Sequence, residues 1–161
     1  MSDHTSASDR PRTAGLRRRS LAKAASWRVI GTLDTLVLAF LTLTFLGPLI
    51  GLEAGPGQNA ATAGSIALAE LVTKIVLYYL HERAWERIGW NLRADGRDGH
   101  GRTTAKTASW RILASLDTTL LAFLFTGSPA AALSIGGLEV ISKLGLYYLH
   151  ERAWARVRWG A

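Results

Sequence analysis

The chain has 161 residues, of which 48% are hydrophobic and 19% charged, and its formal net charge is +7 at pH 7. It contains no cysteine, which excludes disulfides, thiolate metal sites and thiol nucleophiles. Three long stretches, 35–52, 54–69 and 118–138, contain no charged residue. Such segregation is typical of membrane spans. The basic blocks flank the apolar runs instead of lining a face with stacking aromatics, so we expect no nucleic-acid partner.

The chain begins with a polar segment, 1–19, that is rich in Ser and Arg. No apolar stretch in it leads to a small-residue cleavage site, which argues against a removed signal peptide. We therefore predict a disordered, basic cytoplasmic tail at 1–19.

Two stretches after this tail are copies of each other. Segment 23–35 matches 106–118 through Ser-Trp-Arg and Leu-Asp-Thr, and 70–85 matches 139–154 through Leu-Tyr-Tyr-Leu-His-Glu-Arg-Ala-Trp. Each copy predicts a first helix, a turn and a second helix. We place one two-helix membrane repeat at 20–90, a cytoplasmic linker at 91–103 and a second repeat at 104–161. The turn is a long Gly/Pro-rich loop at 47–57 but a tight one at 127–129, where Ser128 is the expected N-cap and Pro129 the first helical residue.

Four apolar stretches are long enough to cross a bilayer, at about 27–46, 61–81, 109–127 and 130–150, since a span needs about 20 residues. A soluble four-helix bundle would need a polar stripe on each helix, yet after Asp34 the first stretch offers only threonines. The predicted fold class is therefore all-α: a polytopic integral membrane protein with four transmembrane helices, arranged as two helical hairpins that are parallel repeats.

Lysine and arginine define the expected orientation. Apart from Lys74 and Lys143, they lie in the N-terminal tail, the 82–111 connection or the C-terminal end. This places both termini in the cytoplasm, in a bacterial inner (cytoplasmic) membrane. The same ends carry an interfacial collar expected to face lipid headgroups, including anionic ones. The collar consists of Trp27, Arg28, Tyr78, His81, Glu82, Arg83, Trp85, Trp110, Arg111, Tyr147, His150, Glu151, Arg152 and Trp154.

A second candidate site consists of ionisable residues within the predicted spans. They are Asp34, Glu70, Lys74, Asp117, Glu139 and Lys143. Asp34 and Lys74 each lie seven residues from an interfacial marker, roughly 10 Å deep, so we predict an ion pair between them. The same argument pairs Asp117 with Lys143. Glu70 is expected to pair with Lys74 or to be protonated.

These intramembrane charges allow two interpretations. They can be structural, pinning helices together, because a polar group in hydrocarbon seeks a partner. They can also line a path for an ion, proton or solute. We favour a structural, accessory or self-associating membrane component that acts as a homo-oligomer or within a membrane complex. The alternative is a small ion- or proton-coupled transporter or channel, working as an oligomer.

Catalysis and metal binding are not expected. The position four residues after His81 is Trp85, so the second histidine of a His-Glu-x-x-His zinc site is missing. No nucleophile and base stand at a workable spacing either. We therefore expect no enzyme activity, no metal and no cofactor.

The duplicated motifs resemble an uncharacterised bacterial membrane family, the domain-of-unknown-function family 2061. The resemblance covers about 20–90 and 104–159, as two tandem copies, and the second copy is closer because of its short Gly-Ser-Pro turn. It implies an inner-membrane protein without an established activity. No catalytic residue carries over from it.

Overall fold

The computed structural model describes residues 10–91 and 98–157, with side chains from Arg19 onward. Four long helices make up this part of the chain: α1 (Arg10–Leu41), α2 (Pro56–Glu86), α3 (His100–Thr126) and α4 (Pro129–Arg156). A π-helical turn η1 (Thr42–Leu46) and a 3₁₀ turn η2 (Gly47–Ile50) follow α1. All four helices are long and apolar enough to cross a membrane, so the predicted fold class is confirmed.

Three helices begin earlier than predicted, among them α2, which begins at Pro56 within the expected loop at 47–57. α1 begins at Arg10, so residues 10–19 of the expected disordered tail are helical, and only 1–9 lie outside the described residues. α3 begins at His100, inside the expected linker, of which 92–97 lie outside the description. Arginine, alanine and leucine favour helix, and a helix need not stop where the hydrocarbon stops. α2, with 31 residues, is about 46 Å long and exceeds a hydrocarbon core of roughly 30 Å.

The second turn matches its sequence signature. Gly127 takes a left-handed conformation, with φ of 66°, and its N–H donates to the carbonyl of Phe123. The Ser128 hydroxyl accepts from the amide of Ala131 at 3.3 Å, and Pro129 begins α4. The predicted N-cap and first helical residue are therefore confirmed.

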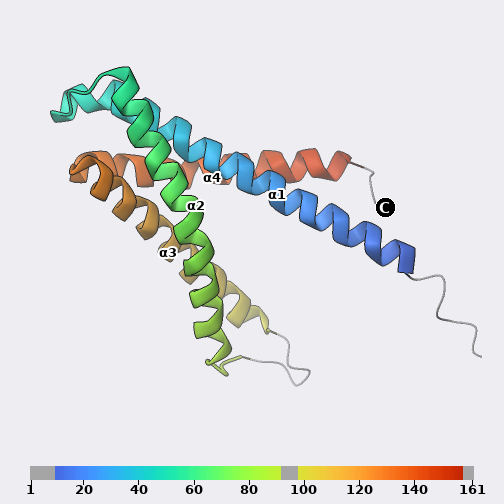
Figure 1. The fold of residues 1–161 in the computed structure, drawn as a ribbon. Helices are drawn as coiled ribbons and strands as arrows, with labels where there is room; N and C mark the ends of the chain where they lie inside the picture. The colour runs from blue at the N-terminus through green and yellow to red at the C-terminus, as the bar shows by residue number, and fades with distance from the viewer. Residues whose placement is uncertain (1–9, 92–97, 158–161) are drawn as a thin grey trace, which may run out of the picture.

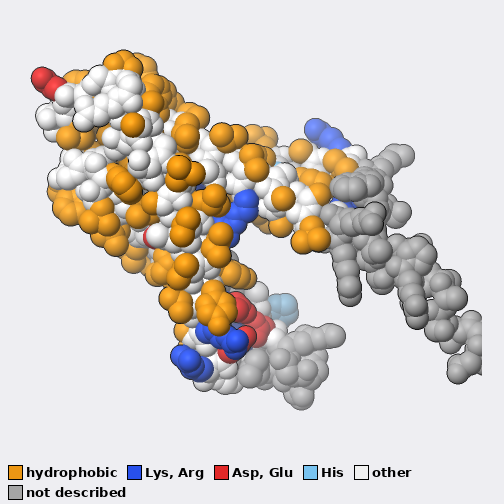
Figure 2. Space-filling model, in the orientation of Figure 1, with side chains coloured by type: hydrophobic (Ala, Val, Ile, Leu, Met, Phe, Trp, Pro, Cys, Tyr) orange, Lys and Arg blue, Asp and Glu red, His pale blue; other side chains and the backbone are white. Residues whose placement is uncertain are grey.

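The interior is built mostly from small side chains together with two isoleucines, whereas most of the large apolar side chains lie outside. The buried apolar cluster consists of Ala39, Ala63, Ile66, Ala122, Ala132 and Ile135. Large residues such as Phe45, Leu133 and Ile141 are about 70% exposed, and hydrophobic side chains cover the sides of the helices in Figure 2. Exposed apolar area on this scale is rare for a monomer in water but is typical of a lipid-facing surface.

The helices meet at their turn ends and separate at their basic ends. Figure 1 shows the two turns together on the left, from which α1 with α4 and α2 with α3 diverge as two pairs. We call these pairs the α1–α4 arm and the α2–α3 arm. Each arm combines the first helix of one repeat with the second helix of the other, so the repeats exchange partners at their basic ends.

Candidate functional site

Four charged side chains meet in the interior, two from α2 and two from α4. We call Glu70, Lys74, Glu139 and Lys143 the charge cluster. The Lys74 ammonium contacts Glu70 Oε1 and lies 3.2 Å from Glu139 Oε1. The Lys143 ammonium contacts Glu139 Oε1 and lies 2.8 Å from Glu70 Oε1. Each lysine therefore binds both carboxylates, and the cluster is electrically neutral.

Two buried threonines complete the coordination of the lysines. Lys74 donates to Thr118 Oγ1 at 2.8 Å, and Lys143 donates to Thr35 Oγ1 at 3.2 Å. Both threonines are completely buried. An ammonium group has three N–H donors, and each lysine now has three acceptors, one of them on a first helix of the other repeat. The cluster thus ties α2 to α3 and α4 to α1.

The predicted ion pairs Asp34–Lys74 and Asp117–Lys143 are wrong. Asp34 Oδ2 instead accepts from Ser142 Oγ, and Asp117 Oδ2 accepts from Thr73 Oγ1, both at 2.8 Å. Among the described residues neither aspartate forms an ion pair.

The reason for this difference is that the donors of both lysines are already used. Lys74 does not extend toward the interface. It folds one turn back to Glu70, and its side chain is only 11% exposed. The expected pairing of Glu70 with Lys74 is present, and it removes the ammonium group that Asp34 would have needed.

One oxygen of each glutamate in the cluster has no hydrogen-bond partner in the described structure. These are Glu70 Oε2 and Glu139 Oε2, on residues that are 5% and 4% exposed. A buried carboxylate oxygen without a donor is costly unless it is protonated or reached by water. These two atoms are the places in the cluster where a proton could be held.

The collar residues form the same hydrogen-bond network in both arms. In the α2–α3 arm, the Ser109 hydroxyl lies 2.8 Å from His81 Nε2 and accepts from Trp85 Nε1 at 3.1 Å. In the α1–α4 arm, Ser26 makes the same two contacts, with His150 and Trp154, at the same distances. The serine of the Ser-Trp-Arg motif therefore joins each first helix to the His-Glu-Arg-Ala-Trp end of the other repeat.

We call this serine–histidine–tryptophan network the joint of each arm. Aromatic rings and ion pairs reinforce it. Trp110 meets Tyr78 edge to face with ring centroids 5.1 Å apart, and Trp27 meets Tyr147 at 5.2 Å. An ion pair spans each arm: Lys106 to Glu82 at 2.5 Å, and Lys23 to Glu151 at 2.6 Å. Collar residues Arg28, Arg83, Arg111 and Arg152 are exposed.

An arginine caps the second helix of each arm. Arg102, which is 4% exposed, donates to the carbonyls of Trp85, Ile88 and Trp90 near the end of α2. Arg19 donates to the carbonyls of Trp154 and Val157 at the end of α4, at 3.1 and 3.2 Å. Cations suit helix C-termini, where carbonyls lack helical donors.

Several of these residues were not among the sequence candidates. They are Arg19, Lys23, Ser26, Thr35, Thr73, Arg102, Lys106, Ser109, Thr118 and Ser142. Most of them are identical in the two copies: Lys and Ser precede the Trp, and Thr follows the Asp. Identity between the repeats was the signal that could have found them. Charge alone favours the aspartates, which are ionisable residues within the predicted spans, over these neutral and interfacial neighbours.

The arms contain a hollow that the charge cluster does not reach. It has a volume of about 270 Å³ and lies between α1 and α4 near their basic ends. The residues that line it are Arg19, Ser20, Lys23, Glu151, Trp154 and Ala155. Neither Glu70 nor Glu139 is among them.

Comparison with known protein families gives a match. The profile of the family described as "Predicted membrane protein (DUF2061)" matches residues 57–86 and 104–155, which is about half of the chain. The match covers the second repeat and the second helix of the first repeat, but not 20–56. Neither a curated protein nor a solved structure matches the chain significantly.

Proposed function

From the premise that the chain belongs to the DUF2061 family of membrane proteins, we propose that it is a non-enzymatic structural or accessory component of a bacterial inner membrane, and that it works by self-association. Its termini and basic ends face the cytoplasm in this proposal. No catalytic group, metal or cofactor takes part.

The burial of the charge cluster and the ion pairs among its four members carry this proposal. All four side chains are at most 17% exposed, and every one forms an ion pair with another member. A buried and neutral cluster is suited to holding helices together, because each charge would cost about 2.5 to 3.5 kcal/mol alone at the centre of a span. A permeation path would need such groups to face water, whereas these four side chains are buried.

The divergence of the arms supports self-association. Beyond the cluster each helix packs on a single neighbour in Figure 1, and the large side chains there are uncovered. Tyr79 and Leu80 are 58% and 54% exposed, and Leu144 and Leu149 are 55% and 62% exposed. A second copy could cover these faces with the same helix-packing rules that act within the chain.

Counting copies in a bilayer tests self-association. The chain is labelled with one fluorophore, reconstituted at low density, and bleached step by step. We expect two or more steps for most particles. Single steps at densities where a known dimer shows two would overturn the proposal, and a known monomeric membrane protein serves as the matched control.

The orientation has a direct test, because the chain has no native cysteine. Glu53→Cys, in the loop between α1 and α2, should react with a membrane-impermeant thiol reagent added to intact cells after the outer membrane has been made permeable. Ser2→Cys should react only after lysis. Equal labelling of both positions in intact cells would reject the proposed topology.

The unpartnered oxygens of Glu70 and Glu139 keep a second candidate function open: a small ion- or proton-coupled transporter or channel, acting as an oligomer. Proteoliposomes that contain wild type, Glu70→Gln or Glu139→Gln separate the two candidates. For a structural protein we expect proton and ion flux at the protein-free background in all three. Flux in wild type that either substitution abolishes would replace the structural proposal with transport.

A further inference from the structure

The two arms carry the same basic residues but different numbers of acidic ones. Among the residues described, the α2–α3 arm (81–91 with 98–111) has five Lys and Arg and three Asp and Glu. The α1–α4 arm (19–28 with 150–157) also has five Lys and Arg, but Glu151 is its single carboxylate. The α1–α4 arm therefore carries a larger net positive charge than the α2–α3 arm.

Asp98 shows where an anion fits in such an arm. Its carboxylate lies 2.7 Å from Arg102 Nε and 3.8 Å from Lys106 Nζ, between the two basic side chains of α3. Lys106 is at the same time paired with Glu82 at 2.5 Å. An arm with a Lys–Glu pair can thus accept a further anion on its Arg and Lys.

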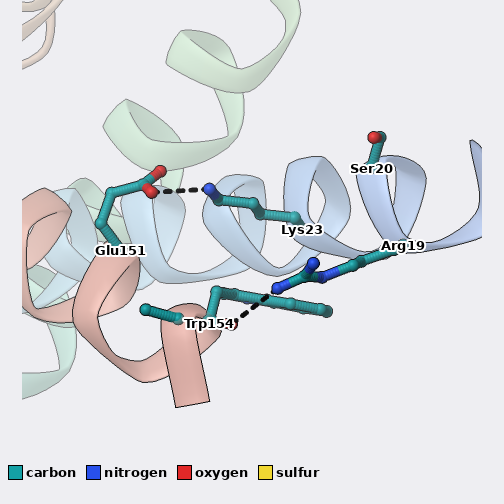
Figure 3. Close-up of a pocket in the computed structure, with 6 residues that line it drawn as sticks. Arg19, Ser20, Lys23, Glu151 and Trp154 are labelled. Atoms are coloured by element: carbon teal, nitrogen blue, oxygen red, sulfur yellow. Dashed lines mark hydrogen bonds and ion pairs between the residues drawn. The ribbon is translucent and has the colours of Figure 1, made fainter. Parts of the chain in front are cut away.

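The equivalents of Arg102 and Lys106 in the α1–α4 arm are Arg19 and Lys23, and both line the hollow of about 270 Å³. In Figure 3, Arg19 and Lys23 extend from α1 toward Trp154 and Glu151 of α4, and these four residues correspond to Arg102, Lys106, Trp85 and Glu82. Arg19 binds backbone carbonyls of α4, and within the described residues no carboxylate contacts its guanidinium.

We propose that this hollow binds an anionic phosphate group, in the position that Asp98 occupies in the α2–α3 arm. Guanidinium and ammonium groups together suit phosphate oxygens, and arginine can contact two of them at once. The hollow is smaller than the roughly 300 to 1,000 Å³ of sites for drug-sized ligands. It therefore suits a headgroup fragment, with the indole of Trp154 as an apolar wall. The inference goes beyond self-association and does not depend on it.

Native mass spectrometry of the full chain tests this site, after purification with mixed phosphatidylglycerol and phosphatidylethanolamine. We expect one phosphatidylglycerol to stay bound to wild type. Arg19→Gln/Lys23→Gln should retain it about 30-fold less, since each basic residue near an anionic lipid contributes about a factor of five. The matched control Arg87→Gln/Arg156→Gln removes two exposed charges that lie outside both the hollow and the interfacial collar, and it should retain the lipid. Equal retention by both double variants would overturn the proposal.

A second variant excludes a trivial loss of folding, because Arg19 also caps α4. The residue equivalent to Ala155 in the α2–α3 arm is Glu86. Ala155→Glu leaves Arg19 and Lys23 in place and adds a carboxylate to the lining of the hollow. It should lose the lipid while its thermal unfolding stays at or above that of wild type. Undiminished lipid binding by this variant would also overturn the proposal.

The same experiment identifies the source of the phosphate. Inorganic phosphate is added at millimolar concentration to wild type that carries the bound lipid. If the lipid stays bound and inorganic phosphate does not bind, the ligand of the hollow is a lipid headgroup. If inorganic phosphate displaces the lipid, the hollow is a phosphate site open to soluble ligands. Binding of neither phosphatidylglycerol nor inorganic phosphate to wild type would reject the site.

Discussion

The two arms are built from the same residues, yet only one of them is joined by a chain connection. Ser109, His81 and Trp85 form the joint of the α2–α3 arm, and Ser26, His150 and Trp154 repeat it in the α1–α4 arm, where the helices are distant in sequence. The joint therefore depends on the motifs and not on the connection.

The connection between α2 and α3 adds polar contacts that close the basic end of the α2–α3 arm. It supplies Asp98 to Arg102 and the backbone carbonyls of Ile88 and Trp90 to the same guanidinium. The α1–α4 arm has no such segment among its described residues and keeps a hollow instead. The two arms therefore share the same serine–histidine–tryptophan contacts but differ in how completely their basic ends are closed.

The largest expected effect tests whether the two halves contribute equally to the charge cluster. Lys74→Met and Lys143→Met should each lower the free energy of unfolding by about 3–5 kcal/mol, because one ammonium is left to neutralise two buried carboxylates. Unfolding in mixed detergent micelles, followed by tryptophan fluorescence, measures it.

The matched control replaces all four members of the cluster with leucine and methionine. This variant should be much closer to wild type, since it leaves no buried charge unpaired. A loss below about 1 kcal/mol in either single variant, or a clear difference between the two, would contradict the equal contribution.

The next effect separates the caps of the two arms. Arg102→Gln should cost about 1.5–3 kcal/mol, because a buried guanidinium bound to three carbonyls and a carboxylate is lost. Arg19→Gln should cost less, since Arg19 has two carbonyls and partial exposure. The same unfolding assay measures both, with exposed Arg111→Gln as control. A larger loss of stability for Arg19→Gln than for Arg102→Gln would show that the α1–α4 arm is the more tightly closed one.

A third prediction concerns helix packing, where the halves differ by one methyl group. A Cβ on Gly136 would lie 2.2 Å from Thr119 Oγ1 and 3.3 Å from Thr119 Cβ, so α4 approaches α3 closely at this point. Gly136→Ala should destabilise by about 1–3 kcal/mol through overpacking. The equivalent residue of α2 is Ala67, and Ala67→Gly should lose only about 1 kcal/mol. Stabilisation by Gly136→Ala would show that the close approach is absent.

The smallest effect tests the exchange of partners between repeats. A double-mutant cycle of Asp117→Asn with Thr73→Val should give a coupling of about 0.6–1.7 kcal/mol, the range for hydrogen bonds between membrane helices. The control cycle combines Asp117→Asn with Ser142→Ala. Ser142 belongs to the same hairpin as Asp117 but hydrogen-bonds Asp34, so the control should be additive. Coupling in the control cycle without coupling in the first cycle would show that Asp117 pairs with its own hairpin and not with the other repeat.

The sequence determined the four helices, the duplication and the position of each charged residue along its helix. Apolar length fixes the four spans, and a rise of about 1.5 Å per residue fixes how far Asp34, Lys74 and their counterparts lie from the interfacial tryptophans. The i, i+4 spacing also predicted the Glu70–Lys74 contact. These properties belong to single helices, and local chemistry is sufficient to define them.

Only the tertiary structure decided which helices are partners. Because the two repeats carry the same motifs at equivalent positions, Asp34 of α1 could face α2 or α4 equally well on sequence grounds. The packing of α4 against α1 and of α2 against α3 made the choice. It also directed each lysine to two glutamates and a threonine, which leaves no donor for an aspartate. A duplicated sequence specifies what can pair, but helix geometry in three dimensions selects among its identical copies.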